Sequence, residues 1–256
     1  MSARLLLAHA LDCSQEQLIA SLRDPVSRDQ EKRFRGLVAR RAQGEPAAYI
    51  LGRKEFYGLD FQVGPKVLIP RPETELLVDL VLKRFQQDQE KVFADLGTGS
   101  GILAVCIARY FPLFRGLACD NSEQALGWAV KNAYRHAVRD RILFFAGDMG
   151  SAVQPSSLDF IVCNPPYLSP EDYGRTSLEI QGFEPVDALL SQERGLGHIN
   201  RLEHAARHSL RVPGILFLEM GSSQAGEVRD IFRDWSRVEI FKDLAGLDRV
   251  AVAEKA

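Results

Sequence analysis

The sequence lacks several features that would define a class of protein. Its four cysteines are far apart and show no Cys-x-x-Cys spacing: Cys13, Cys106, Cys119 and Cys163. This excludes a disulfide framework, and we expect reduced thiols, three of them in the core. No apolar run reaches membrane-spanning length, and the run at Leu5 is too short for a signal peptide. We therefore expect a cytoplasmic protein with no membrane partner.

An excess of charge is also missing. Over 256 residues the net charge is −2 and the isoelectric point is about 6.2. Proteins that grip nucleic-acid phosphates usually carry a basic excess, so we expect no direct nucleic-acid partner. Residues 1–53 differ, because nine Lys and Arg stand there against six Asp and Glu, a net charge of +3. This fits either a surface that faces a partner or a solvated helix face.

What the sequence does contain is an alternation of apolar strands and helices. Seven segments resemble strands, with helices expected between all but the last pair. The short turn at 244–248 predicts that the last two strands are antiparallel. Together with 46% apolar residues, this predicts an α/β fold with one seven-stranded Rossmann-like sheet and an antiparallel last strand. The expected strands begin at Val92, Gly116, Ile142, Leu158, Ile215, Val238 and Arg249.

Two smaller parts precede this main domain, which we place at 73–256. Residues 1–53 are expected to form a small helical domain that docks the substrate, with capping boxes that begin at Ser14 and Ser27. Residues 54–72 are expected to form a β-hairpin connector.

The connector's two strands are predicted at 55–63 and 66–69, around Gly64-Pro65. Later in the chain, the polar stretch 168–195 is long enough to be a substrate-facing lid.

The most informative motif is Asn164-Pro165-Pro166-Tyr167, which follows an apolar strand where α/β sheets present their ligands. Proline restricts its own φ and the conformation of the residue before it, so Asn164 should be held in nearly one conformation. The Asn164 side-chain oxygen and the Pro165 carbonyl could accept both hydrogens of an NH2 group, while Tyr167 stacks on that group. The motif thus predicts methylation of a planar nitrogen, although a plain strand-terminating turn is the alternative.

A glycine-rich loop stands about seventy residues upstream, after the strand that begins at Val92. It reads Asp95-Leu96-Gly97-Thr98-Gly99-Ser100-Gly101 and leads into a helix, an arrangement that lets a ligand approach bare backbone at a helix N-terminus. The loop departs from the dinucleotide fingerprint, because Ile102 replaces its third glycine. Asp95, just ahead of the glycines, suits a ligand that carries positive charge.

Two further strands end in acids. Asp120 stands nineteen residues after Gly101, where a carboxylate can reach ribose hydroxyls. Asp148 and Met149 follow the next strand, where they could contact an adenine. Each acid alone could instead be a helix N-cap. His204 and His208 lack a further ligand at a recognised spacing, so we expect no metal.

From Gly44 onward the chain resembles the release-factor glutamine N5-methyltransferases, the HemK/PrmC family of class I S-adenosylmethionine-dependent enzymes. The resemblance rests on six blocks of the sequence, of which the Pro-Arg-Pro-Glu-Thr-Glu block is the most specific. The blocks are Gly44 to Gly52, Glu55 to Gly58, Ile69 to Glu75, Asp95 to Gly101, Asn164 to Tyr167, and Lys242 to Arg249.

This resemblance implies that S-adenosylmethionine is the methyl donor, without a metal. Its binding residues would be Asp95, Gly97, Thr98, Gly99, Ser100, Gly101, Asp120, Asp148, Met149 and Asn164. The catalytic residues would be Asn164, Pro165, Pro166 and Tyr167. The acceptor would be the glutamine of the Gly-Gly-Gln motif in class I peptide chain release factors, and the enzyme would act as a monomer.

Two departures from the family pattern affect these expectations. The helical part looks short at its N-terminus, which bears on release-factor docking, and residues 188–196 replace a loop that is usually glycine-rich. Two other functions also stay open. One is an amino methyltransferase that acts on a base of DNA or RNA, and the other is a scaffold that binds S-adenosylmethionine without catalysis.

Overall fold

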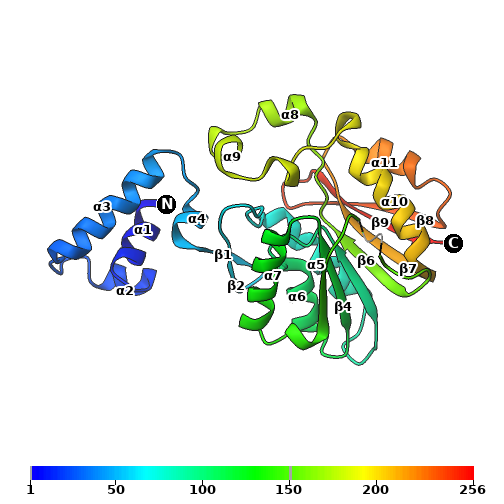
Figure 1. The fold of residues 1–256 in the computed structure, drawn as a ribbon, viewed down its shortest axis with the longest axis horizontal. Coiled ribbons are helices and arrows are strands. Elements are labelled where there is room, and N and C mark those ends of the chain that lie inside the picture. The colour runs from blue at the N-terminus through cyan, green and yellow to red at the C-terminus, as the bar shows by residue number, and fades with distance from the viewer. Residues whose placement is uncertain (1, 150–151) are drawn as a thin grey trace.

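The computed structural model describes residues 2–149 and 152–256. Figure 1 shows a large α/β domain joined to a separate group of helices formed by the N-terminal residues. The N-terminal helices α1 to α3 make the outer lobe, and α4 with the strands β1 and β2 lies between the two parts.

The large domain is built on the seven-stranded sheet that the sequence predicts. The order of its strands is β5-β4-β3-β6-β7-β9-β8, and β9 is antiparallel to both of its neighbours. The predicted antiparallel last strand is therefore confirmed. The strands are β3 Val92–Leu96, β4 Arg115–Asp120, β5 Ile142–Ala146, β6 Leu158–Cys163, β7 Leu210–Glu219, β8 Arg237–Lys242 and β9 Asp248–Lys255.

Helices cover both faces of this sheet (Figure 1). On one face pack α5 (Glu75–Arg84), α6 (Ile102–Tyr110) and α7 (Glu123–Arg135), and on the other α10 (Gly197–Ser209) and α11 (Ala225–Ile231).

Because side chains alternate along a strand, neighbours in the sequence enter different core clusters. Phe93, Phe160 and Phe217 pack under α5 and α6, whereas Ala94 and Leu216 pack under α10 and α11. Cys106, Cys119 and Cys163 are buried, as predicted.

Two of the four N-terminal helices, α2 and α3, begin where the sequence predicts. The helices are α1 Ser2–Ala10, α2 Gln15–Ala20, α3 Arg28–Ala42 and α4 Ala47–Leu51. Ser14 and Ser27 each accept a hydrogen bond from a backbone N–H at the third helical position, and the glutamine there returns one. Both predicted capping boxes are thus confirmed.

The predicted connector hairpin exists, but its strands were misplaced. It consists of β1 (Arg53–Phe56) and β2 (Leu59–Gln62), which pair antiparallel. The turn lies at Tyr57-Gly58, where both residues have positive φ, as in the turns that match the twist of a hairpin. Residues 66–69 form no strand, because the peptide after Gly64-Pro65 runs along the glycine loop instead.

A second correction concerns the connection between β5 and β6, where we expected a helix. The described residues of this segment, 147–149 and 152–157, form turns and bends only. So short a connection leaves no room for a helix that packs on the sheet.

The stretch predicted as a lid does contain short helices. They are α8 Pro170–Gly174, α9 Leu178–Phe183, η3 Val186–Ala188 and η4 Glu193–Gly195, and Figure 1 shows them above the carboxyl ends of the strands. Two more 3₁₀ turns, η1 Pro72–Thr74 and η2 Arg139–Arg141, precede α5 and β5. Pro72 stands at the start of η1, as its ring favours.

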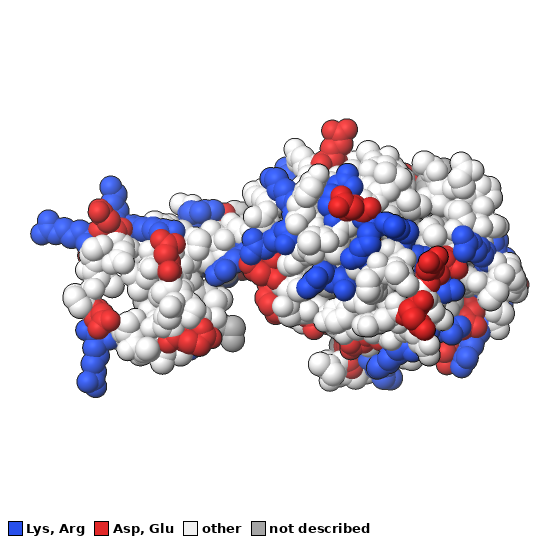
Figure 2. Space-filling view, turned by 90° about the horizontal axis from the view of Figure 1, so that it is seen from below, with Lys and Arg blue, Asp and Glu red and all other residues white. Residues whose placement is uncertain are grey.

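Figure 2 shows the face of the large domain opposite the lid. Lys and Arg are interspersed there with Asp and Glu, and several basic side chains project from the N-terminal lobe. Among residues 2–149 and 152–256, no helix is both long and apolar enough to cross a bilayer.

Candidate active site

The candidate residues meet at the carboxyl ends of β3, β4, β5 and β6. A cavity of about 700 Å³ opens there, and its wall contains Gly97 to Ser100, Asp120, Asp148, Met149 and Asn164. Four segments that are far apart in the sequence therefore contribute to one cavity. This is the position at which open α/β sheets bind their ligands.

The glycine loop owes its shape to left-handed backbone conformations. Gly97, Gly99 and Gly101 all have positive φ. A Cβ on Gly101 would lie 3.0 Å from Cα of Ala129, so only glycine lets the start of α6 approach α7 this closely. As a result, backbone of the loop forms part of the cavity wall.

Asp95 supports this loop from behind. Its side chain is 1% exposed, and Oδ2 accepts hydrogen bonds from Thr98 Oγ1 at 2.7 Å and from the Ala104 N–H at 3.0 Å. Burial raises the pKa of Asp95 to about 7. Among the described residues, Asp95 Oδ1 has no hydrogen-bond partner. The structure thus places Asp95 against the loop and α6 rather than in the cavity wall.

Asp120 lies in the cavity wall and also holds the loop. Its carboxylate accepts hydrogen bonds from the N–H groups of Gly99, at 2.8 Å, and Ser122, at 2.9 Å. Burial raises the pKa of Asp120, and these N–H groups oppose that shift. The helix-cap alternative is wrong for this acid, because Ser122 is the N-cap of α7.

Asp148 and Met149 lie at the rim of the same cavity. Asp148 forms an ion pair of 2.8 Å with Arg201, and 58% of its side chain is exposed. Its neighbour in the wall is His198, whose Nδ1 lies 2.8 Å from Ser191 Oγ. Burial and Arg201 lower the pKa of His198, which favours the neutral imidazole.

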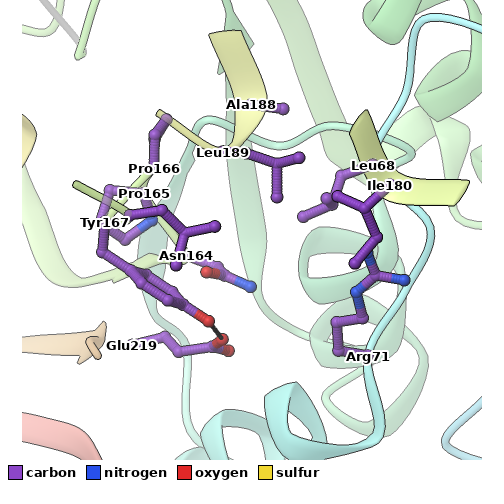
Figure 3. Close-up of a pocket in the computed structure, with 11 residues that line it drawn as sticks. Leu68, Arg71, Asn164, Pro165, Pro166, Tyr167, Ile180, Ala188, Leu189 and Glu219 are labelled. Atoms are coloured by element: carbon purple, nitrogen blue, oxygen red, sulfur yellow. Dashed lines mark hydrogen bonds between the residues drawn. The ribbon is translucent and has the colours of Figure 1, made fainter. Parts of the chain in front are cut away.

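A second, smaller cavity of about 130 Å³ lies beside the Asn-Pro-Pro-Tyr motif (Figure 3). All four residues of the motif line it, and Asn164 and Pro166 line the larger cavity as well. Asn164 Nδ2 donates to Thr74 Oγ1 at 3.1 Å, so its Oδ1 is left as the acceptor. This orientation is the one that the predicted clamp on an NH2 group requires.

Tyr167 closes one side of the smaller cavity. Its hydroxyl donates to Glu219 Oε1 at 3.1 Å, the dashed line in Figure 3. Glu219 is the last residue of β7 and is 1% exposed, and burial raises its pKa to about 7. Burial and this carboxyl also raise the pKa of Tyr167, which keeps its hydroxyl protonated.

Arg71 stands on the opposite side of this cavity and joins it to the lid (Figure 3). Its guanidinium pairs with Glu184 at 2.6 Å, just after α9, and Glu184 also accepts from the Ile69 N–H at 3.1 Å. The lid adds Ile180 and Leu189 to the cavity wall. The charged segment before α5 therefore fixes the lid over the site.

Several residues of this site were not predicted from the sequence, and Glu219 and Gly195 are the clearest examples. Glu219 was overlooked because it ends an apolar strand. The same pattern, a single acid at the carboxyl end of a strand, had predicted Asp95 and Asp120. Gly195 was also missed, and a side chain there would collide with the Tyr167 carbonyl. Across residues 2–149 and 152–256, no three His, Cys, Asp or Glu lie together in a group that could hold a metal.

Comparisons with known proteins agree with this geometry. Residues 1–52 match the family described as PrmC N-terminal domain, and residues 74–179 match the methyltransferase small domain. Among solved structures, the catalytic domain of hMettl16 in complex with a MAT2A 3′UTR hairpin superposes with a TM-score of 0.62. It is 17% identical, and the match covers 82% of this chain and 79% of that one, so it shows the fold alone.

Several curated relatives bear the name release factor glutamine methyltransferase. The protein of Nitratidesulfovibrio vulgaris (strain Hildenborough) is 41% identical over 260 residues, which cover all of this chain and 88% of the relative. That of Koribacter versatilis (strain Ellin345) is 39% identical over 256 residues, which cover all of this chain and 91% of the relative. The chain belongs to the release factor glutamine methyltransferase family.

Proposed function

We propose that this protein transfers a methyl group from S-adenosylmethionine to the side-chain nitrogen (N5) of the glutamine in the Gly-Gly-Gln motif of class I peptide chain release factors. The observation that carries the proposal is that Asn164 lines both cavities. A donor in the larger cavity and an amide in the smaller one would therefore meet at this side chain.

The size and the lining residues of the larger cavity support S-adenosylmethionine as its ligand. Gly97 to Gly101 would leave backbone open to the methionine part, Asp120 would accept from the ribose hydroxyls, and Asp148 and Met149 would contact the adenine. When bound, S-adenosylmethionine would supply a methyl group on a positively charged sulfur: the N–C bond would form as the C–S bond broke, the electron pair of the broken bond would stay on sulfur, and the nitrogen would pass its proton to water.

The smaller cavity suits a primary amide. An amide nitrogen is a poor nucleophile, because its lone pair is delocalised into the carbonyl group. Asn164 Oδ1 and the Pro165 carbonyl would each accept one N–H, which leaves the lone pair free to turn away from the amide plane. Tyr167 would pack on the flat group. Holding the nitrogen in place is the main contribution of these residues, and such positioning can lower a barrier by several kcal/mol.

The release factor would approach over the lid and the N-terminal helices. Arg41, near the end of α3, pairs with Glu179 of α9 at 2.5 Å, so the helical lobe contacts the lid next to Ile180, which lines the smaller cavity. One chain builds both cavities, so we propose a monomer that acts in the cytoplasm, where release factors work, and needs no nucleic acid.

The test is transfer of labelled methyl from S-adenosylmethionine to a purified class I release factor. The controls are a factor with Gly-Gly-Ala in place of Gly-Gly-Gln, duplex DNA and ribosomal RNA. We expect label on the intact factor alone. Label on a nucleic acid would instead support the base methyltransferase, and cofactor binding without any transfer would support the scaffold.

A further inference from the structure

The buried carboxyl of Glu219 is a part of the site to which the mechanism above gives no role. Side chains alternate along β7, so Glu219 lies on the same face of the sheet as Phe217, the face that α5 and η1 cover. Thr74 of η1 is buried there as well. Glu219 is therefore enclosed between the sheet and the segment that contacts Asn164.

Two short connections join Glu219 to the Asn-Pro-Pro-Tyr motif. The Tyr167 hydroxyl donates directly to Glu219 Oε1 at 3.1 Å. On the other side, the Thr74 hydroxyl lowers the pKa of Glu219, as a donor to its carboxylate does, and Thr74 Oγ1 accepts from Asn164 Nδ2 at 3.1 Å. The first and last residues of the motif thus share one buried carboxyl as their support.

Arg249 links Glu219 to the turn between β8 and β9. Arg249 donates through Nε to Asp243 at 3.2 Å and through a terminal nitrogen to the Met220 carbonyl at 3.4 Å. Only 14% of its side chain is exposed, and its positive charge opposes the rise in the pKa of Glu219. The remaining charged or titratable neighbours are Glu73 of η1, which raises that pKa, and the thiol of Cys163.

We propose that Glu219 is a positioning residue for methyl transfer: its carboxylate holds Tyr167 and Thr74, and through Thr74 it keeps Asn164 Oδ1 directed at the acceptor nitrogen. This inference rests on the proposed function, because it concerns how the acceptor is held. Glu219 lines the smaller cavity, but it is only 1% exposed and its Oε1 is occupied by the Tyr167 hydroxyl, so we assign its effect to the side chains that it holds. Among the described residues, its Oε2 has no hydrogen-bond partner, so a buried carboxyl is retained at a cost.

The test compares Glu219→Gln, Tyr167→Phe and the double variant in methyl transfer to a release factor. We expect Glu219→Gln to lower kcat about 10²-fold, as small misplacements in active sites do, and to leave the Kd of S-adenosylmethionine unchanged. The double variant should be no slower than Glu219→Gln, because both substitutions weaken the same contact between Tyr167 and residue 219. Wild-type kcat should fall as the pH drops below neutral and Glu219 is protonated, and Glu219→Gln should lose this dependence.

The matched control is Glu203→Gln. Glu203 of α10 is also buried, and it accepts from Trp235 at 2.9 Å and from Arg207 at 2.8 Å, but it lines neither cavity. Its variant should keep wild-type kcat. The inference would be overturned if Glu219→Gln kept the wild-type kcat. It would also be overturned if the fold losses in kcat of the two single variants multiplied in the double variant. A loss of cofactor binding in step with kcat would also overturn it, since that would be a folding defect. Failure of the wild-type enzyme to methylate the factor would instead refute the proposed function.

Discussion

The substitution Asn164→Ala tests the proposed hydrogen bonds between Asn164 and the acceptor amide. The substitution removes Oδ1, which would accept one N–H of the acceptor, and it breaks the 3.1 Å hydrogen bond to Thr74. Removal of one preorganised hydrogen-bonding group from an active site costs about 2.7–4 kcal/mol, or about 10²–10³ in kcat. The glycine loop and Asp120 belong to other strands, so the Kd of S-adenosylmethionine should change by less than about tenfold.

The assay is single-turnover methyl transfer to a release factor, with the Kd of the cofactor measured separately. The matched control is Asn200→Ala, which also removes a side-chain hydrogen bond of an asparagine, the exposed 2.8 Å bond to Glu193, but lies outside both cavities. We expect the control to keep wild-type kcat. Near-normal turnover in Asn164→Ala would show that the clamp reasoning is wrong.

Three further predictions concern the glycine loop and its supports. Asp120→Ala should raise the Kd of S-adenosylmethionine about 10- to 100-fold in a calorimetric titration, because it removes charge-assisted hydrogen bonds of about 1.5–3 kcal/mol; an unchanged Kd would contradict this. Gly101→Ala should lower the free energy of unfolding by about 2 kcal/mol or more, since φ is +82° and Ala129 lies 3.0 Å from the new Cβ. In the same urea titration, Gly127→Ala in α7 should raise it by about 0.5–1 kcal/mol, because no heavy atom lies within 4 Å there. Asp95 binds its proton more tightly when folded, with a pKa of about 7 against an ordinary 3.8, so its contribution to stability is complete below about pH 4 and is lost as the pH rises towards 7. Asp95→Asn should therefore weaken the decline in the free energy of unfolding between about pH 5 and pH 7. An unchanged decline would show that another group causes it.

The main sheet and the candidate site could be predicted because their signals are local. Buried parallel strands are continuous apolar runs, and the acids at their ends stand out against them. That is why the sequence alone could place Asp95, Asp120 and Asn164 at one edge of the sheet. The capping boxes at Ser14 and Ser27 were equally predictable, because each depends on residues only three positions apart.

The errors came from features that depend on distant parts of the chain. The connector hairpin was misplaced because Tyr57, not a typical turn residue, adopts positive φ beside Gly58. Gly64-Pro65 looked like the better turn, yet a Cβ on Gly64 would lie 2.6 Å from the Trp128 side chain, a contact that the sequence could not reveal. The pairing of Arg71 with Glu184 spans more than a hundred residues, and Glu219 supports the motif from another strand.

The central claim is that an amide nitrogen is held at Asn164, where the two cavities meet. The most direct measurement is mass-spectrometric mapping of the methyl group on a class I release factor after reaction with the wild-type enzyme. Our account predicts one added methyl, on the side-chain nitrogen of the Gly-Gly-Gln glutamine. A methyl group on another residue, or on an oxygen rather than a nitrogen, would contradict it.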